Sequence, residues 1–303
     1  MSEAEFVAVD WGTSSFRLWV IGSDGRVLAS TRGSQGMSRL KQDEFGPVLE
    51  GYFAELGVGA GIPALVCGMA GAAQGWCEAP YHSAISPLEH IGALAVRVGD
   101  AAREVLILPG LRQDDPANVM RGEETQILGF LRSEPGYAGT IALPGTHTKW
   151  CRISGGTVLR FDTCMSGEFF ALLSDSSVLR HSTRGGGWDD AAFRGAVSQG
   201  FNDPGKLATT WFGLRSDMLL GDLHASIATA RLSGWLIGWE LAATREYWHG
   251  TELRLIGERT LCHRYLAAVE SLGGQARIVN SETATLAGLK SAWMQIRRKS
   301  FDT

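Results

Sequence analysis

Short apolar runs separated by polar turns open the chain. Apolar residues 6–9 and 16–21 flank the polar segment 10–15, and a third run, 26–29, follows the turn at 23–25. Runs of this length, bounded by glycine, serine and aspartate, are typical of β-strands joined by tight turns. The pattern therefore predicts a three-stranded meander near the start of the chain.

The same pattern returns later in the chain. The strands predicted for this second copy are 139–143, 149–153 and 157–161. Adding 133 to the numbering aligns Gly12 with Gly145 and Thr13 with Thr146. Internal similarity of this kind indicates a duplicated domain, with two hairpins facing each other across a cleft.

The rest of the chain alternates between strand and helix patterns. Further strands are expected at 64–67, 104–108, 253–256 and 276–279. Helices are expected at 44–56, from Asp222 to about Trp248, and in the segment that ends at Leu272; two more begin near residues 121 and 281. Gly234 and Gly238 are four residues apart in the long helix, which indicates close helix packing rather than a binding site. The alternation predicts an α/β protein.

The first polar turn carries chemistry that suits a nucleotide. Gly12 lets the backbone approach a phosphate closely, and Thr13 and Ser14 can donate hydrogen bonds. Asp10 could hold a hydrated Mg²⁺, and Arg17 could reach a phosphoryl oxygen. A plain meander with a polar turn accounts for this stretch equally well.

The second turn lacks the acid of the first. Leu143 occupies the position that corresponds to Asp10. One half can therefore hold a metal, while the other holds phosphate through backbone N–H groups, Thr146 and Lys149. This asymmetry favours the phosphate-binding hypothesis for both turns.

Two further segments are candidates for a site. The glycine-rich block 68–76 ends a strand, and its Gln74 and Trp76 could contact a polar small molecule. A structural glycine turn is the alternative for this block. Glu123 and Glu124 begin a predicted helix, where the helix dipole alone favours carboxylates.

Composition excludes several classes of protein. The 303 residues carry a formal charge of −4 and no dense basic tract, which argues against a strong nucleic-acid binder. Five scattered cysteines without a C-x-x-C motif indicate reduced thiols, not disulfides or a zinc site. No signal peptide or membrane span is evident, so we expect a cytoplasmic protein with no membrane partner.

Several motifs together resemble one family. D-W-G-T-S-S-F-R and P-G-T-H-T-K-W are similar to the two phosphate motifs of sugar kinases in the actin/hexokinase/Hsp70 superfamily, and L-I-G-E-R-T to a degenerate adenosine motif. More narrowly, G-M-A-G-A-A-Q-G-W-C-E-A-P-Y, N-V-M-R-G-E-E-T-Q-I-L-G and M-S-G-E resemble the 2-dehydro-3-deoxygalactonokinase family. These blocks lie between residues 10 and 168, and the C-terminal half matches more loosely.

The resemblance implies a fold, a reaction and a domain division. It implies two RNase H-like α/β domains around a nucleotide-binding cleft, at residues 1–132 and 133–303. It also implies ATP- and Mg²⁺-dependent phosphorylation of the 6-hydroxyl of 2-dehydro-3-deoxy-D-galactonate, within galactonate breakdown. The implied partners are ATP and a small sugar acid, and a homodimer is left open.

The resemblance also implies roles for the first turn. Asp10 would take the Mg²⁺ or one of its waters. Gly12, Thr13, Ser14 and Arg17 would contact the transferred phosphate.

In the second half, the resemblance implies nucleotide contacts. Gly145, Thr146 and His147 would hold the β-phosphate side, and Gly257 would lie under the adenosine. Related kinases carry a small residue after this last glycine, whereas Glu258 follows it here.

The general base and the substrate contacts are less sharply defined. In related kinases an acidic residue at the start of a helix serves as base, which implies Glu123, although relatives usually have Asp there. Glu124 and Asp115 therefore stay alternatives. The substrate carboxylate needs a cationic partner, for which the candidates are Arg39, Arg112 and Arg121, in a pocket shaped by Gln74, Trp76 and Tyr81.

Two rival functions stay open. One is a kinase for another 2-keto-3-deoxy sugar acid, such as the gluconate epimer, and a panel of substrates separates it. The other is a non-enzymatic sugar- or ATP-binding member of the superfamily, such as a chaperone or regulator, for which no additional domain is evident.

Overall fold

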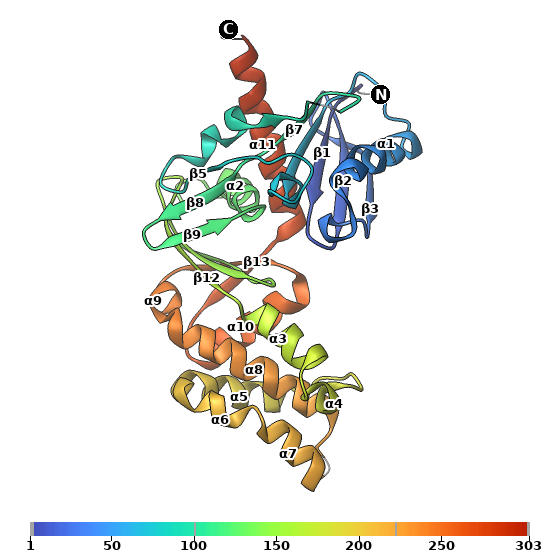
Figure 1. Cartoon of the computed structure of the whole chain (residues 1–303). Coiled ribbons are helices and arrows are strands. Elements are labelled where there is room, and N and C mark those ends of the chain that lie inside the picture. The colour runs from blue at the N-terminus through green and yellow to red at the C-terminus, as the bar shows by residue number, and fades with distance from the viewer. Residues whose placement is uncertain (1–2, 100, 222, 302–303) are drawn as a thin grey trace. The chain divides into compact units, whose positions relative to one another are not determined.

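The computed structural model of the chain describes residues 3–99, 101–221 and 223–301. The elements form two compact α/β units (Figure 1). Unit 1 contains Met1–Tyr137, Ile153–Arg160 and Ser281–Thr303, and unit 2 contains Ala138–Arg152 and Phe161–Asn280. Each unit has its own main sheet and its own buried core.

The main sheet of unit 1 has the strand order β3-β2-β1-β4-β7-β6. Its strands are β1 (Ala4–Trp11), β2 (Phe16–Gly22), β3 (Val27–Gly33), β4 (Ala64–Gly68), β6 (Val96–Arg97) and β7 (Val105–Ile107). The antiparallel meander β1–β3 confirms the pattern predicted from the apolar runs, and β4 joins β1 in parallel. Every residue of β4 is buried, as expected for a central parallel strand.

An aromatic cluster fills the core on one face of this sheet. Trp11 at the end of β1 packs against Phe16, Phe45 and Trp76, with ring centroids 4.7, 4.8 and 6.0 Å away. Phe45 begins α1 (Phe45–Glu55), which covers this face. The cluster fixes the end of β1, where the first polar turn begins.

The terminal helix α11 (Ser281–Phe301) belongs to unit 1. Trp293 on α11 stacks on Phe6 of β1 at 4.6 Å. The helix crosses α2 (Glu123–Ser133) so closely that a Cβ on Gly129 or on Gly288 would overlap a backbone carbonyl of the other helix. Two glycines therefore permit the helix contact that closes unit 1.

Smaller elements complete unit 1. They are η1 (Met37–Arg39), η2 (Gln42–Glu44), η3 (Met69–Gly71), η4 (Leu88–Leu94) and a three-stranded sheet of β5 (Tyr81–Ser83), β8 (Gly110–Asp114) and β9 (Ala117–Met120). β9 leads through two residues into α2, so this small sheet positions the start of that helix.

The sheet of unit 2 repeats the arrangement of the first one. Its order is β12-β11-β10-β13-β14, with strands β10 (Gly139–Leu143), β11 (Thr148–Ser154), β12 (Thr157–Cys164), β13 (Leu253–Gly257) and β14 (Ala276–Asn280). β10, β13 and β14 run parallel. In both sheets a three-strand meander is extended by a parallel strand, which confirms the internal repeat.

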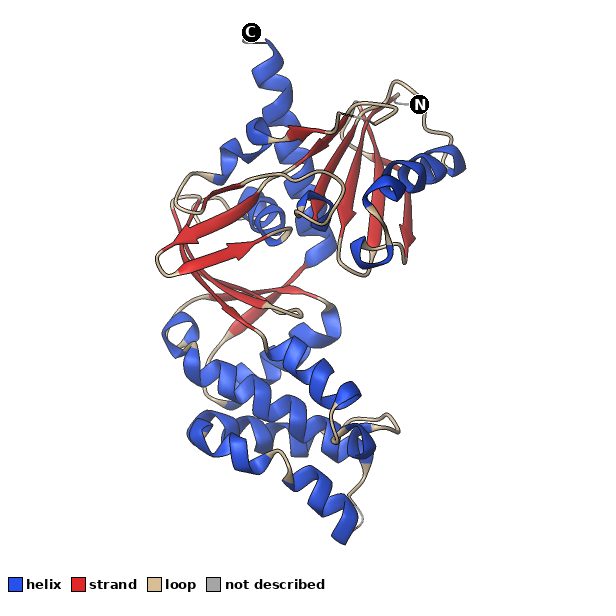
Figure 2. Cartoon of the chain, viewed as in Figure 1, coloured by secondary structure: helices blue, strands red, loops and turns tan. Residues whose placement is uncertain are grey.

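Helices dominate the rest of unit 2 (Figure 2). They are α3 (Ser166–Ala171), η5 (Leu172–Ser176), α4 (Arg180–Thr183), α5 (Asp190–Asn202), η6 (Pro204–Lys206), α6 (Leu207–Thr210), α7 (Gly213–Leu220), α8 (Ala225–Ala243), α9 (Arg245–Trp248) and α10 (Arg259–Ser271). The long helix predicted up to Trp248 is α8 followed by α9, and Asp222, expected at its start, lies outside the described residues.

The pair of glycines in α8 has the packing role that its spacing suggested. A Cβ on Gly234 would lie 2.5 Å from the carbonyl oxygen of Phe193 in α5, and one on Gly238 would overlap that of Val197. α5 and α8 therefore touch backbone to backbone along this stripe.

The contacts divide the chain differently from the predicted domains at 1–132 and 133–303. Residues 153–160 and 281–303 group with unit 1. The reason for α11 is physical, because its apolar side chains and Gly288 pack on elements of unit 1. A boundary at residue 132 between functional domains stays a prediction.

Replacing each of two glycines on facing helices by alanine should change the stability of the chain differently. Gly238→Ala should lower the free energy of unfolding by about 1–3 kcal/mol, because the added methyl forces α5 and α8 apart. Gly195→Ala, on the exposed side of α5 with nothing within 4 Å, should leave it unchanged or raise it by up to about 1 kcal/mol. Urea unfolding measures both, and equal stabilities would contradict the packing role of Gly238.

Candidate active site

The first turn, residues 12–15, joins β1 to β2. The Gly12 N–H donates to the Ser15 carbonyl at 2.9 Å, while the side chains of Thr13 and Ser14 are exposed. The carbonyls of Gly12 and Thr13 accept N–H groups from Met37 and Ser38, at 3.0 and 2.9 Å. Those carbonyls are thereby held by the protein.

We call residues 36–38 the first brace. A Cβ on Gly36 would overlap the Thr13 carbonyl, so only glycine lets this segment approach the turn. The Ser38 hydroxyl adds a second hydrogen bond to Thr13, at 2.9 Å. A turn whose carbonyls are tied down on one side can present N–H and hydroxyl donors to an anion on the other.

Asp10 and Arg17 face each other across β1 and β2. They are register partners, and the Arg17 guanidinium forms an ion pair with Oδ2 of Asp10, with Nε at 3.1 Å. The Cys67 thiol lies 3.9 Å from Oδ1 of Asp10. Both members of the pair are mostly buried, so Arg17 holds the Asp10 carboxylate in one orientation.

Gly68 brings the base of the first turn next to helix α2. Its φ is +90°, and a Cβ there would lie 2.6 Å from the Trp11 carbonyl and 3.5 Å from Oδ1 of Asp10. Gly122, with φ of +102°, is the residue before α2, and its own Cβ would lie 3.4 Å from the Gly68 Cα. The ends of β1 and β4 and the start of α2 therefore meet at one point.

The two glutamates at the start of α2 have different environments. Glu123 is half-buried, and its carboxylate accepts the Arg121 N–H at 3.0 Å. Glu124 is fully buried, and it accepts the Gly122 N–H at 2.7 Å and the Thr125 hydroxyl at 3.1 Å. Burial, reinforced by the neighbouring Glu123 charge, raises the pKa of Glu124 to about 8. Glu123 is thus the accessible carboxylate of the two.

Asp115, the third candidate base, lies away from this point. β8 and β9 pair Asp114 with Ala117 and Leu111 with Met120, so Asp115 is in the turn at the far end of the hairpin from α2. At about 3.4 Å per residue, the four residues of β9 separate the two ends by roughly 10 Å.

The residues predicted to shape a substrate pocket have mixed positions. Gln74 and Arg39 are exposed, and Tyr81 is 38% exposed. Trp76 instead lies in the core, stacked against Phe45 at 6.1 Å. Its position is explained by packing of the aromatic cluster.

The second turn, residues 145–147, is braced like the first. The Glu168 N–H donates to the Thr146 carbonyl at 3.0 Å, and the Glu168 carboxylate lies 2.7 Å from Nε2 of His147. A Cβ on Gly167 would overlap the Gly145 carbonyl. Residues 166–168, the second brace, thus repeat the first one.

Lys149 does not share the environment of this turn. It is 6% exposed in β11, where it points to the opposite face from its neighbours Thr148 and Trp150. Thr148 and Trp150 face helices α10 and α8, through Tyr265 and Glu240.

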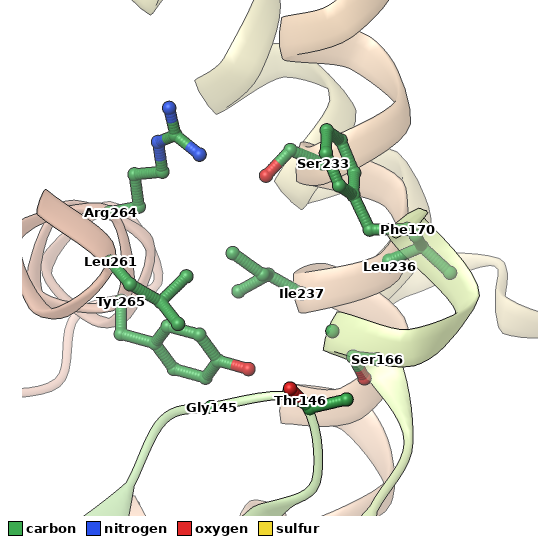
Figure 3. A pocket seen from close by; sticks show the side chains of 11 residues that line it. Gly145, Thr146, Ser166, Phe170, Ser233, Leu236, Ile237, Leu261, Arg264 and Tyr265 are labelled. Carbon is green, nitrogen blue, oxygen red and sulfur yellow. The ribbon is translucent and has the colours of Figure 1, made fainter. Parts of the chain in front are cut away.

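A cavity of about 260 Å³ lies beside the second turn in unit 2. Figure 3 shows Arg264 and Ser233 at one end of it and the turn at the other. Its lining comes from α3, α8, α10 and the turn: Gly145, Thr146, Ser166, Gly167, Phe170, Ser233, Leu236, Ile237, Leu261, Arg264 and Tyr265. The Arg264 guanidinium lies 3.9 Å from the ring centroid of Trp188, which orients it.

A buried carboxyl supports the floor of this cavity. Glu240 of α8 accepts the Trp150 indole N–H at 2.7 Å and the Tyr265 hydroxyl at 3.0 Å. Tyr265 also lies 3.0 Å from the Thr148 hydroxyl, at the end of the turn. Burial raises the pKa of Glu240 to about 7.

Gly257 and Glu258 have structural roles at the end of β13. A Cβ on Gly257 would lie 2.7 Å from the Pro144 carbonyl, so glycine lets β13 pass the start of the second turn. Gly257 is not among the residues that line the cavity. Glu258 caps α10 by accepting the N–H groups of Thr260 and Leu261 at 2.9 and 2.8 Å, and these bonds lower its pKa. The residue that departs from the family pattern is therefore a helix cap.

Several site residues were missed by sequence reasoning. They are the brace glycines Gly36 and Gly167 and the cavity residues Ser233, Arg264 and Tyr265. One signal was available, because a glycine next to serine and methionine follows the meander in both halves. The cavity residues come from helices distant in sequence, for which no local pattern exists.

Comparison with known proteins gives the family. A family model described as 2-keto-3-deoxy-galactonokinase matches residues 10–292. The chain belongs to this family. It is 40% identical to the Rhizobium meliloti (strain 1021) protein named Probable 2-dehydro-3-deoxygalactonokinase DgoK1, over 95% of this chain and 96% of the relative. It is 33% identical to the 2-dehydro-3-deoxygalactonokinase of Escherichia coli (strain K12), over 95% and 97%.

Solved structures agree with the predicted fold class. A crystal structure of a Sinorhizobium meliloti protein assigned as a 2-dehydro-3-deoxygalactonokinase has a TM-score of 0.91 at 40% identity, covering 96% of both chains. The activator of 2-hydroxyisocaproyl-CoA dehydratase from Clostridium difficile, solved with bound ADPNP, has a TM-score of 0.52 at 12% identity, over 98% of this chain and 97% of that one. This chain is therefore a kinase with the actin-like ATPase fold.

Two features are absent from the described part of the chain. Over residues 3–99, 101–221 and 223–301, no helix is long and apolar enough to cross a membrane. The same part of the chain holds no group of three or more histidine, cysteine or acidic side chains able to bind a metal.

The two buried glutamates should make stability fall as pH rises. In the unfolded chain both carboxyls have a pKa near 4.5, whereas in the folded chain the pKa is about 7 for Glu240 and about 8 for Glu124. Between pH 4.5 and these folded-state values, the folded chain therefore binds more protons than the unfolded chain. In Glu240→Gln the drop in unfolding free energy between pH 5 and pH 8 should shrink by on the order of 2 kcal/mol. Urea unfolding at both pH values measures it, with exposed Glu270→Gln as the control. An unchanged drop would contradict the environment assigned to Glu240.

Proposed function

We propose that this chain transfers the γ-phosphoryl group of ATP to the 6-hydroxyl of 2-dehydro-3-deoxy-D-galactonate. The observation that carries the proposal is the pair of braced turns, one in each unit, with Asp10 and Glu123 beside the first and an apolar cavity beside the second. The substrate follows from the names of the relatives, which are 40% and 33% identical.

The second turn and its cavity are the proposed nucleotide site. Gly145, Thr146 and His147 contact the β-phosphate side, on a turn whose Thr146 carbonyl is already held by the second brace. The apolar side chains of α8 and α10 accept the adenosine. Gly257 acts indirectly, by giving the turn its room at Pro144. Lys149, buried in β11 just after the turn, is the proposed source of positive charge for the phosphate.

The first turn is the proposed site of the transferred phosphate. Thr13 and Ser14 donate to it, Gly12 lets the backbone approach it closely, and Arg17 supplies positive charge while it orients Asp10. Tight positioning matters most, since phosphoryl transfer asks the protein mainly for alignment and charge neutralisation.

Asp10 fits a Mg²⁺ site of the kind common in kinases. Mg²⁺ keeps several waters and takes one or two carboxylates plus substrate phosphates, so a cluster of acids is unnecessary. Oδ2 of Asp10 is engaged by Arg17, while Oδ1 has, among the described residues, only the weak thiol contact of Cys67. Oδ1 would therefore hold the ion or one of its waters, and the bound ion would neutralise phosphate charge.

Glu123 is the proposed general base. It is the more exposed of the two glutamates at the start of α2, and the residue before it, Gly122, packs on Gly68 beside Asp10. Glu124 is fully buried, and burial raises its pKa to about 8, which leaves Glu123 as the more accessible carboxylate at this helix end. The base accepts the proton of the 6-hydroxyl as that oxygen attacks the γ-phosphorus.

The proposed substrate contacts lie on unit 1. Gln74, Arg39 and Tyr81 are exposed on unit 1 and are the proposed substrate contacts, with Trp76 supporting them from the core. Closure of the two domains around one nucleotide, cytoplasmic location and a homodimer stay predictions. Light scattering measures the last of these.

Replacing the proposed base tests the chemistry. Glu123→Gln should lower kcat by about 100-fold or more with little change in the KM for ATP, because proton acceptance is lost and shape is kept. A coupled ADP-release assay measures it, and Asp115→Asn on the hairpin turn is the matched control. Near-normal turnover in Glu123→Gln would rule this residue out as base.

The metal-side carboxylate and the substrate need their own tests. Asp10→Asn should abolish turnover while the chain still folds, with a melting temperature lowered by several degrees, since Arg17 loses its charged partner.

The same assay with a panel of 2-keto-3-deoxy acids tests the substrate. Equal rates with the gluconate epimer would defeat the galactonate assignment.

The second brace can be tested through nucleotide binding. Gly167→Ala places a methyl against the Gly145 carbonyl, so the turn must shift and affinity for a non-hydrolysable ATP analogue should fall at least about 10-fold. Calorimetry measures the affinity, with Gly195→Ala in the same unit as the control. Unchanged affinity would remove the second turn from the nucleotide site.

A further inference from the structure

Arg121 lies in the two-residue connection between β9 and α2. Its Nη2 donates to the Ala79 carbonyl at 2.6 Å, and its guanidinium lies 4.4 Å from the ring centroid of Tyr81. Gly71 leaves it room, because a Cβ there would lie 2.7 Å from Nη1. The segment 79–81 thus holds this guanidinium in place, and Gly71 leaves room for it.

Two of the three guanidinium nitrogens are buried without a partner. Nε and Nη1 of Arg121 are inaccessible to solvent and have no hydrogen-bond partner. Among the residues that the structure describes, no carboxylate forms an ion pair with Arg121, whereas Arg103, also buried, is paired with Glu50 at 2.6 Å. Leaving a charged donor buried and unpaired is costly, and such groups are rare outside functional sites.

The position of Arg121 relates it to the proposed base. Its own N–H donates to the Glu123 carboxylate at 3.0 Å, and the next residue, Gly122, packs against Gly68 beside Asp10. The same short connection therefore orients the base and presents an unpaired cation.

We infer that Arg121 binds the carboxylate of the sugar-acid substrate and selects acids over neutral sugars. The inference rests on the proposed function, whose substrate has a carboxylate at one end and the accepting hydroxyl at the other. Nη2 has a second N–H beyond the one given to Ala79, with which it can donate to a carboxylate, and the charge of the guanidinium has no protein carboxylate beside it in the described part of the chain. The ligand supplies the countercharge that the protein lacks.

The other two candidate arginines lack these properties. Arg112 is exposed, and its Nε lies 3.5 Å from the Asp114 carboxylate. Arg39 is exposed on η1. A solvated guanidinium discriminates weakly between charged and neutral ligands, because water already satisfies it.

Steady-state kinetics tests the selectivity. Arg121→Gln should raise the KM for the acid by on the order of 100-fold and leave the KM for ATP unchanged, with Arg121→Lys in between. The wild type should prefer the acid to its neutral amide, and Arg121→Gln should lose that preference. Arg97→Gln, an exposed arginine paired with Glu104, is the control.

A thermal-shift measurement separates recognition from structural support. Without substrate, Arg121→Met should melt no lower than the wild type, since it removes an uncompensated charge. It should lose the upward shift that the acid produces in the wild type. A lower melting temperature with the acid-induced shift retained would overturn the inference.

The outcomes distinguish this inference from the proposed function. If Arg121→Gln phosphorylates the acid with unchanged KM, the inference is wrong and the kinase assignment stands. A wild type that uses the amide as well as the acid also overturns it. A wild type that binds the acid with a melting shift lost in Arg121→Met, yet transfers no phosphoryl group, supports the inference and defeats the kinase assignment.

Discussion

The capture of backbone carbonyls behind two glycine turns is the constraint on which the candidate site depends. In an unbraced turn the N–H groups attract an anion, whereas the carbonyl oxygens repel it. In this chain the carbonyls of Gly12, Thr13 and Thr146 are tied to residues 37, 38 and 168. Gly36 and Gly167 make the approach possible. The electrostatics of both turns are thus decided by segments more than twenty residues further along the chain.

Similar side chains near these turns differ in their burial and in their partners. Glu123 and Glu124 are neighbours in sequence, yet one is accessible and the other is enclosed with a raised pKa. Arg17 has a carboxylate partner, whereas Arg121 has none among the described residues. Residue type alone would not distinguish the members of either pair. Their surroundings set which one is charged, neutral or in need of a ligand.

Local patterns were sufficient to predict much of the fold. Both meanders, the central strands and the internal repeat follow from apolar runs and glycine turns, and the role of Gly234 and Gly238 from their spacing. The braces, the cavity lining and the place of α11 could not be predicted, because they depend on contacts between distant segments. Trp76 shows the same limit, since an aromatic residue in a glycine-rich block suits a pocket or a core equally well. Motif resemblance gave the family, which the comparisons confirm.

The place of α11 in unit 1 has a consequence for how the chain is made. Nearly all of unit 2 lies between the strands of unit 1 and α11 in the sequence, so it leaves the ribosome before α11 does. Until then Phe6 lacks its stacking partner Trp293, and Gly129 of α2 lacks the helix that crosses it. Unit 2, although its synthesis starts after that of unit 1, can therefore finish folding before unit 1 does. A nascent chain stopped before residue 281 would expose an apolar face, the kind of surface that chaperones and proteases recognise.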